Sequence, residues 1–183
     1  FRVINLIHAY RTRGHLFTKT NPVRARRDYS PDFNIGHFGL DEAELAPVFE
    51  AGSAVGIGAA PLRDIIAHLE ETYCHSIGIE FMYIREPERW NWFKDHIELA
   101  NRPVLSDAEK KQVFKKLNQA TVFEEFLQKK FGGQKRFSVE GGESLLPALD
   151  AIVERGSELG AKEFIIGMAH RGRLNTLAHI LNK

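Results

Sequence analysis

The sequence has 183 residues, of which 43% are hydrophobic and 27% are charged, and its formal net charge is +1. This length is enough for one domain or two small ones, and the composition predicts a buried core and excludes a disordered chain. A net charge so close to zero gives no overall attraction to nucleic acid. No apolar run is long enough to span a membrane, and no signal peptide is visible.

The predicted elements begin with a helix near residue 1. Apolar side chains recur there at the spacing of one helical face: Val3, Leu6, Ile7 and Tyr10. Gly14 is placed to end this helix. Residues 19–40 are rich in Pro, Asn, Asp and Gly, which predicts irregular structure. The only cysteine is Cys74, so no internal disulfide can form, which fits a reducing compartment.

More helices are predicted from their first turns. Two starts carry the residue pair of a capping box: Asp41 with Glu44, and Ser106 with Glu109. Pro61 and Pro87 are suited to the first position of two others. The predicted inward-facing residues are Leu45, Val48 and Phe49, then Leu62, Ile65, Ile66 and Leu69, then Trp90, Phe93 and Ile97, and finally Val113, Phe114 and Leu117. The pattern through about residue 130 is therefore almost entirely helical.

The pattern changes near Gly132. Residues 131–142 predict a loop, and an amphipathic helix follows, with Leu145, Leu149, Ile152 and Val153 on one face and Pro147 in its first turn. The apolar run 164–168 predicts a buried parallel strand. After a polar turn at 169–173, a last helix is predicted from Leu174, Leu177, Ala178 and Leu181. Helix, strand, loop and helix in this order indicate the start of an α/β domain.

The turn 169–173 is the strongest candidate site in the sequence. It lies between the predicted strand and the next helix, where open α/β sheets bind ligands and where a helix start attracts anions. His170, Arg171 and Arg173 add hydrogen-bond donors and positive charge. The alternative is a solvated basic turn without a ligand. A P-loop is excluded, because Arg173 and Leu174 stand where that motif needs Lys and a magnesium-binding Ser or Thr.

A local excess of positive charge marks residues 1–27. This segment has no Asp or Glu and seven basic residues: Arg2, Arg11, Arg13, Lys19, Arg24, Arg26 and Arg27. Arg11 and Arg13 cannot share the face of the apolar stripe, so they point to solvent or into another groove. The segment predicts contact with an anionic effector or an acidic partner surface. A solvated basic face and a helical anion- or nucleic-acid-binding module are the alternatives.

Three segments together resemble a known family. They are residues 9–15 (AYRTRGH), 135–142 (KRFSVEGG) and 168–175 (MAHRGRLN), and residues 73–84 match the region between them. In this order and spacing they are similar to the decarboxylating, thiamine-diphosphate-dependent component of the 2-oxoglutarate dehydrogenase complex. The similarity runs through all 183 residues and suggests the amino-terminal part of a longer family member.

The resemblance implies a fold and a chemistry. It implies a mostly α-helical region at 1–115, followed at 116–183 by the incomplete start of an α/β domain of the thiamine-diphosphate-enzyme type. It implies oxidative decarboxylation of 2-oxoglutarate in the tricarboxylic acid cycle, with thiamine diphosphate and magnesium as cofactors. The family's magnesium and diphosphate motif is expected after Lys183, so no metal ligand is assigned to these residues. We expect the 183 residues alone to be inactive and to bind no cofactor stably.

The resemblance also implies residue roles and partners. His170 is the expected catalytic residue, contacting the 2-oxo acid or its adduct, and Arg171 is the expected cofactor-binding residue. The succinyl group would pass to a lipoyl-bearing succinyltransferase component, and the enzyme would be a homodimer. A nucleotide or acetyl-coenzyme A is the candidate effector for segment 1–27, and neither nucleic acid nor a membrane is an expected partner. The expected compartment is the cytoplasm in a bacterium and the mitochondrial matrix in a eukaryote.

Overall fold

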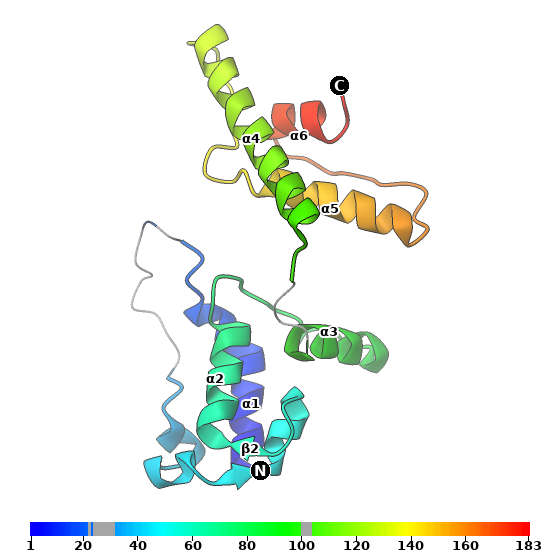
Figure 1. The fold of residues 1–183 in the computed structure, drawn as a ribbon. Helices are drawn as coiled ribbons and strands as arrows, with labels where there is room; N and C mark the ends of the chain where they lie inside the picture. Colours follow the sequence, from blue (N-terminus) through cyan, green and yellow to red (C-terminus); the bar gives the residue numbers. More distant parts are fainter. Residues whose placement is uncertain (22, 24–31, 100–103) are drawn as a thin grey trace. The chain divides into compact units, whose positions relative to one another are not determined.

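The computed structural model describes residues 1–21, 23, 32–99 and 104–183, and it divides into two compact units, Phe1–Pro103 and Val104–Lys183 (Figure 1). The first unit contains helices α1 (Arg2–Arg13), α2 (Leu62–Tyr73) and α3 (Pro87–Leu99), with strands β1 (Val48–Phe49) and β2 (Ala60–Pro61). The second contains α4 (Asp107–Lys130), α5 (Leu145–Glu158) and α6 (Arg173–His179). Short 3₁₀ helices lie at Gly14–Phe17, Ile35–Phe38, Glu42–Leu45 and Glu50–Val55. The described chain is therefore mostly helical, as predicted.

The core of the first unit forms between α1 and α2. The stripe predicted on α1 is buried, and Leu6 and Ile7 are almost fully enclosed against Ile65 and Leu69 of α2. Gly14 ends α1, as predicted, although its backbone is right-handed. A Cβ atom at Gly14 would lie 2.5 Å from Cβ of Tyr73. The glycine is therefore needed for the close approach of α1 to the end of α2, since a larger residue would separate the helices.

Local signals predicted most helix starts in the first unit. The capping box of Asp41 and Glu44 is confirmed, although the helix it begins is a single 3₁₀ turn. Pro87 begins α3, as predicted. Pro61 was predicted as the first helical residue, but it is extended and pairs with Val48 in a two-stranded antiparallel sheet, so α2 begins one residue later. Its fixed φ suits either conformation, and the pairing with β1 decides between them.

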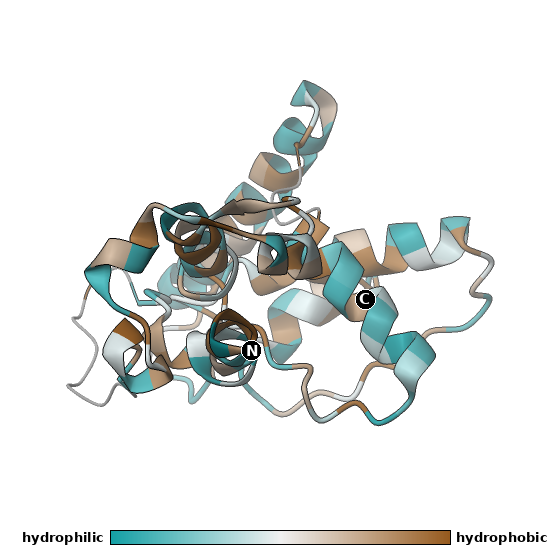
Figure 2. Cartoon of the chain, turned by 90° about the horizontal axis from the view of Figure 1, so that it is seen from below, coloured by the Kyte–Doolittle hydropathy of each residue, from teal (hydrophilic) through white to brown (hydrophobic). Residues whose placement is uncertain are grey.

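Helices α4, α5 and α6 pack together in the second unit. The capping box of Ser106 and Glu109 begins α4, and Pro147 lies in the first turn of α5, both as predicted. Figure 2 shows hydrophobic and hydrophilic residues interspersed along the helices. Phe114 was expected to face inward but is 71% exposed, and Phe93 on α3 is also exposed. In the described residues, no helix is long and apolar enough to cross a membrane.

The strand predicted at 164–168 is not present. Residues 161–169 run without a strand partner, and Ile165 is 98% exposed. An apolar run becomes a strand only when another strand pairs with it, and no described segment does so. The start of an α/β domain thus stays a prediction. The domain boundary predicted at 115 also stays a prediction. Helix α4 runs unbroken through this position, and the two compact units divide between Pro103 and Val104.

Candidate functional site

The turn at 169–173 leads directly into α6. Gly172 precedes the helix with a φ of +73°, a left-handed conformation that favours glycine. Its N–H donates to the carbonyl oxygen of Phe137 at 2.9 Å. A Cβ atom at Gly172 would lie 3.0 Å from Cγ2 of Val139. The turn is therefore packed closely against residues 137–139, which belong to another of the segments singled out in the sequence.

His170 and Arg171 are presented on the exposed side of this turn. The ring of Phe137 lies beside that of His170, with 4.6 Å between their centroids. The guanidinium of Arg171 is 6.0 Å from the centroid of the same ring, and its Nη1 donates to the carbonyl oxygen of Ser138 at 3.0 Å. Both side chains are thus held by residues 137 and 138 while remaining accessible to a ligand.

Arg173 has a different role from that of its neighbours. Its Nε donates to the carbonyl oxygen of Ala169 at 3.1 Å, and its Nη2 reaches that of Met168 at 3.4 Å. The side chain therefore folds back over its own turn and stabilises the backbone shape there. The sequence grouped Arg173 with His170 and Arg171 as a possible donor to a ligand, but its hydrogen bonds are internal.

A buried carboxylate below the turn was missed in the sequence. Glu124 of α4 is only 2% exposed. Its Oε1 accepts from the backbone N–H of Val139 at 3.3 Å and from Nδ2 of Asn175 at 3.1 Å. Its Oε2 accepts from Nη1 of Arg136, which forms the ion pair that a buried carboxylate needs. One side chain on α4 thus binds both segments of the candidate site.

Asn175 completes this network. It is fully buried, and its Nδ2 also donates to the carbonyl oxygen of Ala120 on α4 at 2.9 Å. Arg136 donates further to Oε1 of Gln128 at 2.8 Å. The sequence offered one signal for this network: Arg136 and Asn175 lie inside the family motifs, although neither residue belongs to an apolar stripe. Nothing in the local pattern around Glu124 distinguishes it from a solvated helix residue.

Comparison with known proteins supplies relatives for the whole chain. It is 44% identical over 99% of its length to the 2-oxoglutarate dehydrogenase E1 component of Azotobacter vinelandii. It is also 44% identical over its full length to the multifunctional 2-oxoglutarate metabolism enzyme of Mycolicibacterium vanbaalenii. The chain is homologous to part of the 2-oxoglutarate dehydrogenase E1 component. This confirms the resemblance inferred from the motifs.

The chain spans only 20% and 15% of the length of these two relatives. No family model matches it. The roles predicted for His170 and Arg171 therefore stay predictions. Within the described ranges, no group of three or more His, Cys, Asp or Glu side chains is placed to hold a metal ion.

The first E1-like motif, residues 9–15, contributes to a buried ion pair. Arg11 donates through Nε and Nη2 to the two carboxylate oxygens of Glu98, at 2.7 and 2.8 Å. Tyr73 donates its hydroxyl to Oε1 of Glu98 at 2.6 Å, and Arg11 also reaches the carbonyl oxygen of Ala54. Burial alone would lower the pKa of Arg11, but the hydrogen bond and charge of Glu98 raise it overall. Burial and Glu98 also raise the pKa of Tyr73 far above its usual range.

This pairing corrects the interpretation of Arg11. It was expected to point to solvent or into a groove that binds an anion, but it joins α1 to α3 inside the first unit. Arg13 is exposed and lies 5.8 Å from the ring centroid of Phe33. Arg24, Arg26 and Arg27 lie outside the described residues, so their part of the effector hypothesis stays a prediction.

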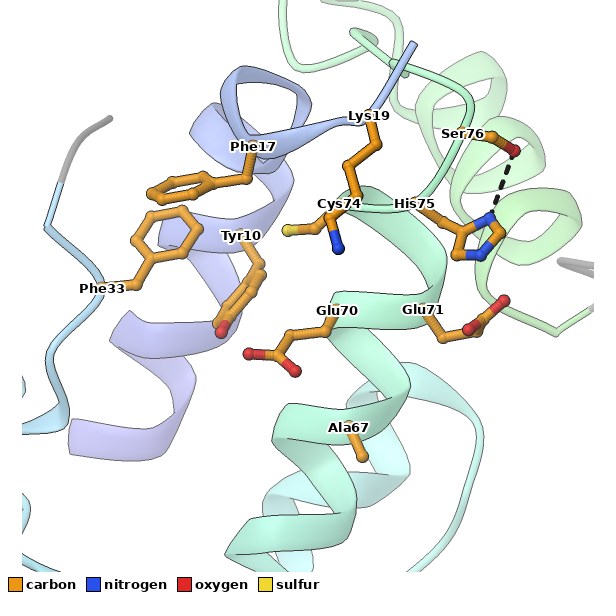
Figure 3. Close-up of a pocket in the computed structure, with 10 residues that line it drawn as sticks. All are labelled: Tyr10, Phe17, Lys19, Phe33, Ala67, Glu70, Glu71, Cys74, His75 and Ser76. Atoms are coloured by element: carbon orange, nitrogen blue, oxygen red, sulfur yellow. Dashed lines mark hydrogen bonds between the residues drawn. The ribbon is translucent and has the colours of Figure 1, made fainter. Parts of the chain in front are cut away.

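A cavity of about 680 Å³ lies beside α1 and α2 in the first unit (Figure 3). Figure 3 shows the Glu70 carboxylate and the Cys74 thiol pointing toward Tyr10. Burial, followed by the charge of Glu70, raises the pKa of Cys74 to about 11. The same two causes raise the pKa of Tyr10. Carboxylates among aromatic rings do not match the phosphates of a nucleotide or of acetyl-coenzyme A.

Proposed function

We propose that this chain is part of an E1 component that oxidatively decarboxylates 2-oxoglutarate and transfers the succinyl group to a lipoyl-bearing succinyltransferase. The observation that carries the proposal is the 44% identity to a 2-oxoglutarate dehydrogenase E1 component and to a multifunctional 2-oxoglutarate metabolism enzyme. The turn at 169–173 supports it, because it combines an imidazole with a guanidinium on an exposed surface. A homodimer, and a cytoplasmic or mitochondrial-matrix location according to source, belong to the same proposal.

The residues of the turn suit a 2-oxo acid substrate and an anionic cofactor. The imidazole of His170 can donate or accept a hydrogen bond and move a proton near neutral pH. A guanidinium has five N–H donors, and the structure gives Arg171 one hydrogen bond, to the carbonyl oxygen of Ser138. Its remaining donors can bind anionic oxygens. We assign His170 to the reacting substrate and Arg171 to the negative charge of the cofactor or its bound intermediate.

The chain by itself does not fit the whole cofactor. Thiamine diphosphate, bound through magnesium, would supply an electron sink for loss of carbon dioxide. In the described residues, no group of three or more His, Cys, Asp or Glu side chains could hold a metal ion, and Arg171 offers a single guanidinium to a diphosphate. We propose that its magnesium ligands belong to the rest of the protein, and that the 183 residues alone bind no thiamine diphosphate in a calorimetric titration.

The alternative of an anion- or nucleic-acid-binding module receives no support from the described residues. Arg11 is committed to Glu98 and so cannot contact a backbone phosphate without breaking a buried pair. A nucleotide or acetyl-coenzyme A effector remains a proposal that concerns Arg13, Arg24, Arg26 and Arg27.

The test is turnover by the full-length protein that contains this segment. Carbon dioxide release would be measured with ferricyanide as electron acceptor, using 2-oxoglutarate and pyruvate as substrates, with and without thiamine diphosphate and magnesium. We expect turnover of 2-oxoglutarate that depends on both cofactors and greatly exceeds turnover of pyruvate. Carbon dioxide release that does not depend on the cofactors, or equal turnover of pyruvate, would overturn the proposal.

A further inference from the structure

We infer that Glu124 and Asn175 are positioning residues of the candidate site, acting through His170 and Arg171 without touching the substrate. The inference rests on the proposed function, because it concerns the same turn. Its starting point is that one carboxylate oxygen, Oε1 of Glu124, accepts hydrogen bonds from both sides of the site. It binds Val139 from the segment beside the turn and Asn175 from the helix that follows the turn.

The first connection runs from Glu124 to the support beneath the two side chains. Glu124 holds Val139 through its backbone N–H and Arg136 through its guanidinium. Residues 137 and 138 lie between these two anchors. They supply the aromatic ring beside His170 and the carbonyl oxygen that accepts from Arg171. The supporting segment is therefore fixed to α4 at each end.

The second connection runs from Glu124 to the turn itself. Asn175 lies in the first turn of α6, three residues after Gly172, and its amide group reaches both Glu124 and the carbonyl oxygen of Ala120. Gly172 in turn donates to the carbonyl oxygen of Phe137. The turn and its support thus contact each other directly and also share one anchor on α4, so one buried carboxylate helps to fix their relative position.

Burial makes this anchor sensitive to substitution. Glu124 and Asn175 are 2% and 0% exposed, so water cannot replace a lost partner without opening the packing. Removing the carboxylate takes one acceptor from Val139, Asn175 and Arg136 at the same time, and Asn175 keeps only the carbonyl oxygen of Ala120. A displacement of about 1 Å at a catalytic group can cost on the order of 10²-fold in rate. We expect Glu124→Ala to reduce kcat by about that factor, with a smaller change in KM.

A structural role alone would give a different pattern from a positioning role. Asp150 on α5 provides the matched control, because it accepts from Lys116 of α4 at 2.7 Å and both side chains are 15% exposed. This pair stabilises the same unit and contacts neither the turn nor its support, although Lys116 also donates to the carbonyl oxygen of His179 at the end of α6 at 3.0 Å. Asp150→Asn should therefore lower the melting temperature while leaving kcat within about twofold of wild type.

The experiment uses the full-length enzyme with thiamine diphosphate and magnesium. Wild type, Glu124→Ala, Glu124→Gln, Asn175→Ala and Asp150→Asn would be compared in kcat and KM for 2-oxoglutarate, well below the lowest melting temperature of the set. Glu124→Gln keeps an acceptor oxygen for Val139 and Asn175 but turns an amide N–H group toward Arg136, so we expect a smaller loss of kcat than in Glu124→Ala, within about tenfold of wild type. If Glu124→Ala does not fold, Asn175→Ala serves in its place, because it frees α6 while Val139 stays anchored.

A second measurement separates this inference from the proposed function. Hydrogen exchange at the Gly172 amide reports the hydrogen bond to Phe137 whatever substrate the enzyme uses. We expect faster exchange in Glu124→Ala and Asn175→Ala but not in Asp150→Asn. Wild-type enzyme that does not turn over 2-oxoglutarate would overturn the proposed function. Active wild type with normal kcat in Glu124→Ala and Asn175→Ala, or an equal loss in Asp150→Asn, would overturn the positioning role alone.

Discussion

Replacing Arg11 by Met tests the buried ion pair of the first unit. The substitution keeps an unbranched apolar stem but leaves the carboxylate of Glu98 with Tyr73 as its remaining hydrogen-bond donor. The side chains of Arg11 and Glu98 are 12% and 1% exposed, so the pair is not a surface salt bridge. Loss of one member of a buried pair costs about 3–5 kcal/mol, and the hydroxyl of Tyr73 favours the lower end, about 3 kcal/mol.

That energy corresponds to a large change in melting temperature. For a unit of this size, 1 kcal/mol shifts the midpoint by about 4–8 °C, so Arg11→Met should lower it by about 12–24 °C. The assay is thermal unfolding by calorimetry, with hydrogen exchange in α1 and α3 to assign the transition to the first unit.

Two variants serve as controls for this prediction. Arg13→Met removes an exposed guanidinium of the same motif and should cost less than about 0.5 kcal/mol. Arg11→Lys keeps the charge but not the bidentate geometry, so its loss of stability should lie between those of Arg13→Met and Arg11→Met. Equal shifts for Arg11→Met and Arg13→Met would refute the reasoning and restore Arg11 as a candidate effector ligand.

Two other predictions concern Gly172 and Cys74. Gly172→Ala should destabilise the fold by about 1–2 kcal/mol because of its left-handed backbone, and by more because it displaces Val139, so turnover should fall. Gly133→Ala is the control: its φ is +85° and nothing lies within 4 Å of its Cβ, so only the backbone effect should remain. Identical effects of the two variants on melting temperature and turnover would contradict the packing argument. The pKa of Cys74, raised to about 11, predicts that iodoacetamide modification of this only cysteine rises with a midpoint near pH 11, and a midpoint near the ordinary value of 9.0 would contradict it. Because the folded pKa is the higher one, the stability from the neutral thiol is complete below about pH 9 and is lost as pH rises toward 11.

Local patterns predicted most of the helices. The apolar stripe on α1 and the capping boxes at Asp41 and Ser106 depend on residues three or four positions apart, so the sequence contains the whole signal. The strand expected at 164–168 failed for the opposite reason. A strand depends on a partner that its own residues do not specify, and the described chain has none there.

The candidate site was predicted in part. His170 and Arg171 were identified from the position and charge of their turn, and the family motif supplied their expected roles; their accessibility in the structure is compatible with those roles. The anchors were missed because Glu124 and Arg11 are charged residues on helices, where a charge usually indicates a solvated face. Their partners Asn175 and Glu98 are 51 and 87 residues away in the sequence. Only the folded chain brings these groups together.

The most direct test of the account is the substitution His170→Ala in the full-length enzyme. Turnover of 2-oxoglutarate with thiamine diphosphate and magnesium would be compared with wild type and with His8→Ala, which removes an exposed histidine of α1. If the imidazole of His170 handles a proton or developing charge, as proposed, His170→Ala should keep its melting temperature and lose on the order of 10²-fold or more in kcat. Near-normal turnover by a folded His170→Ala enzyme would contradict the catalytic assignment of the turn.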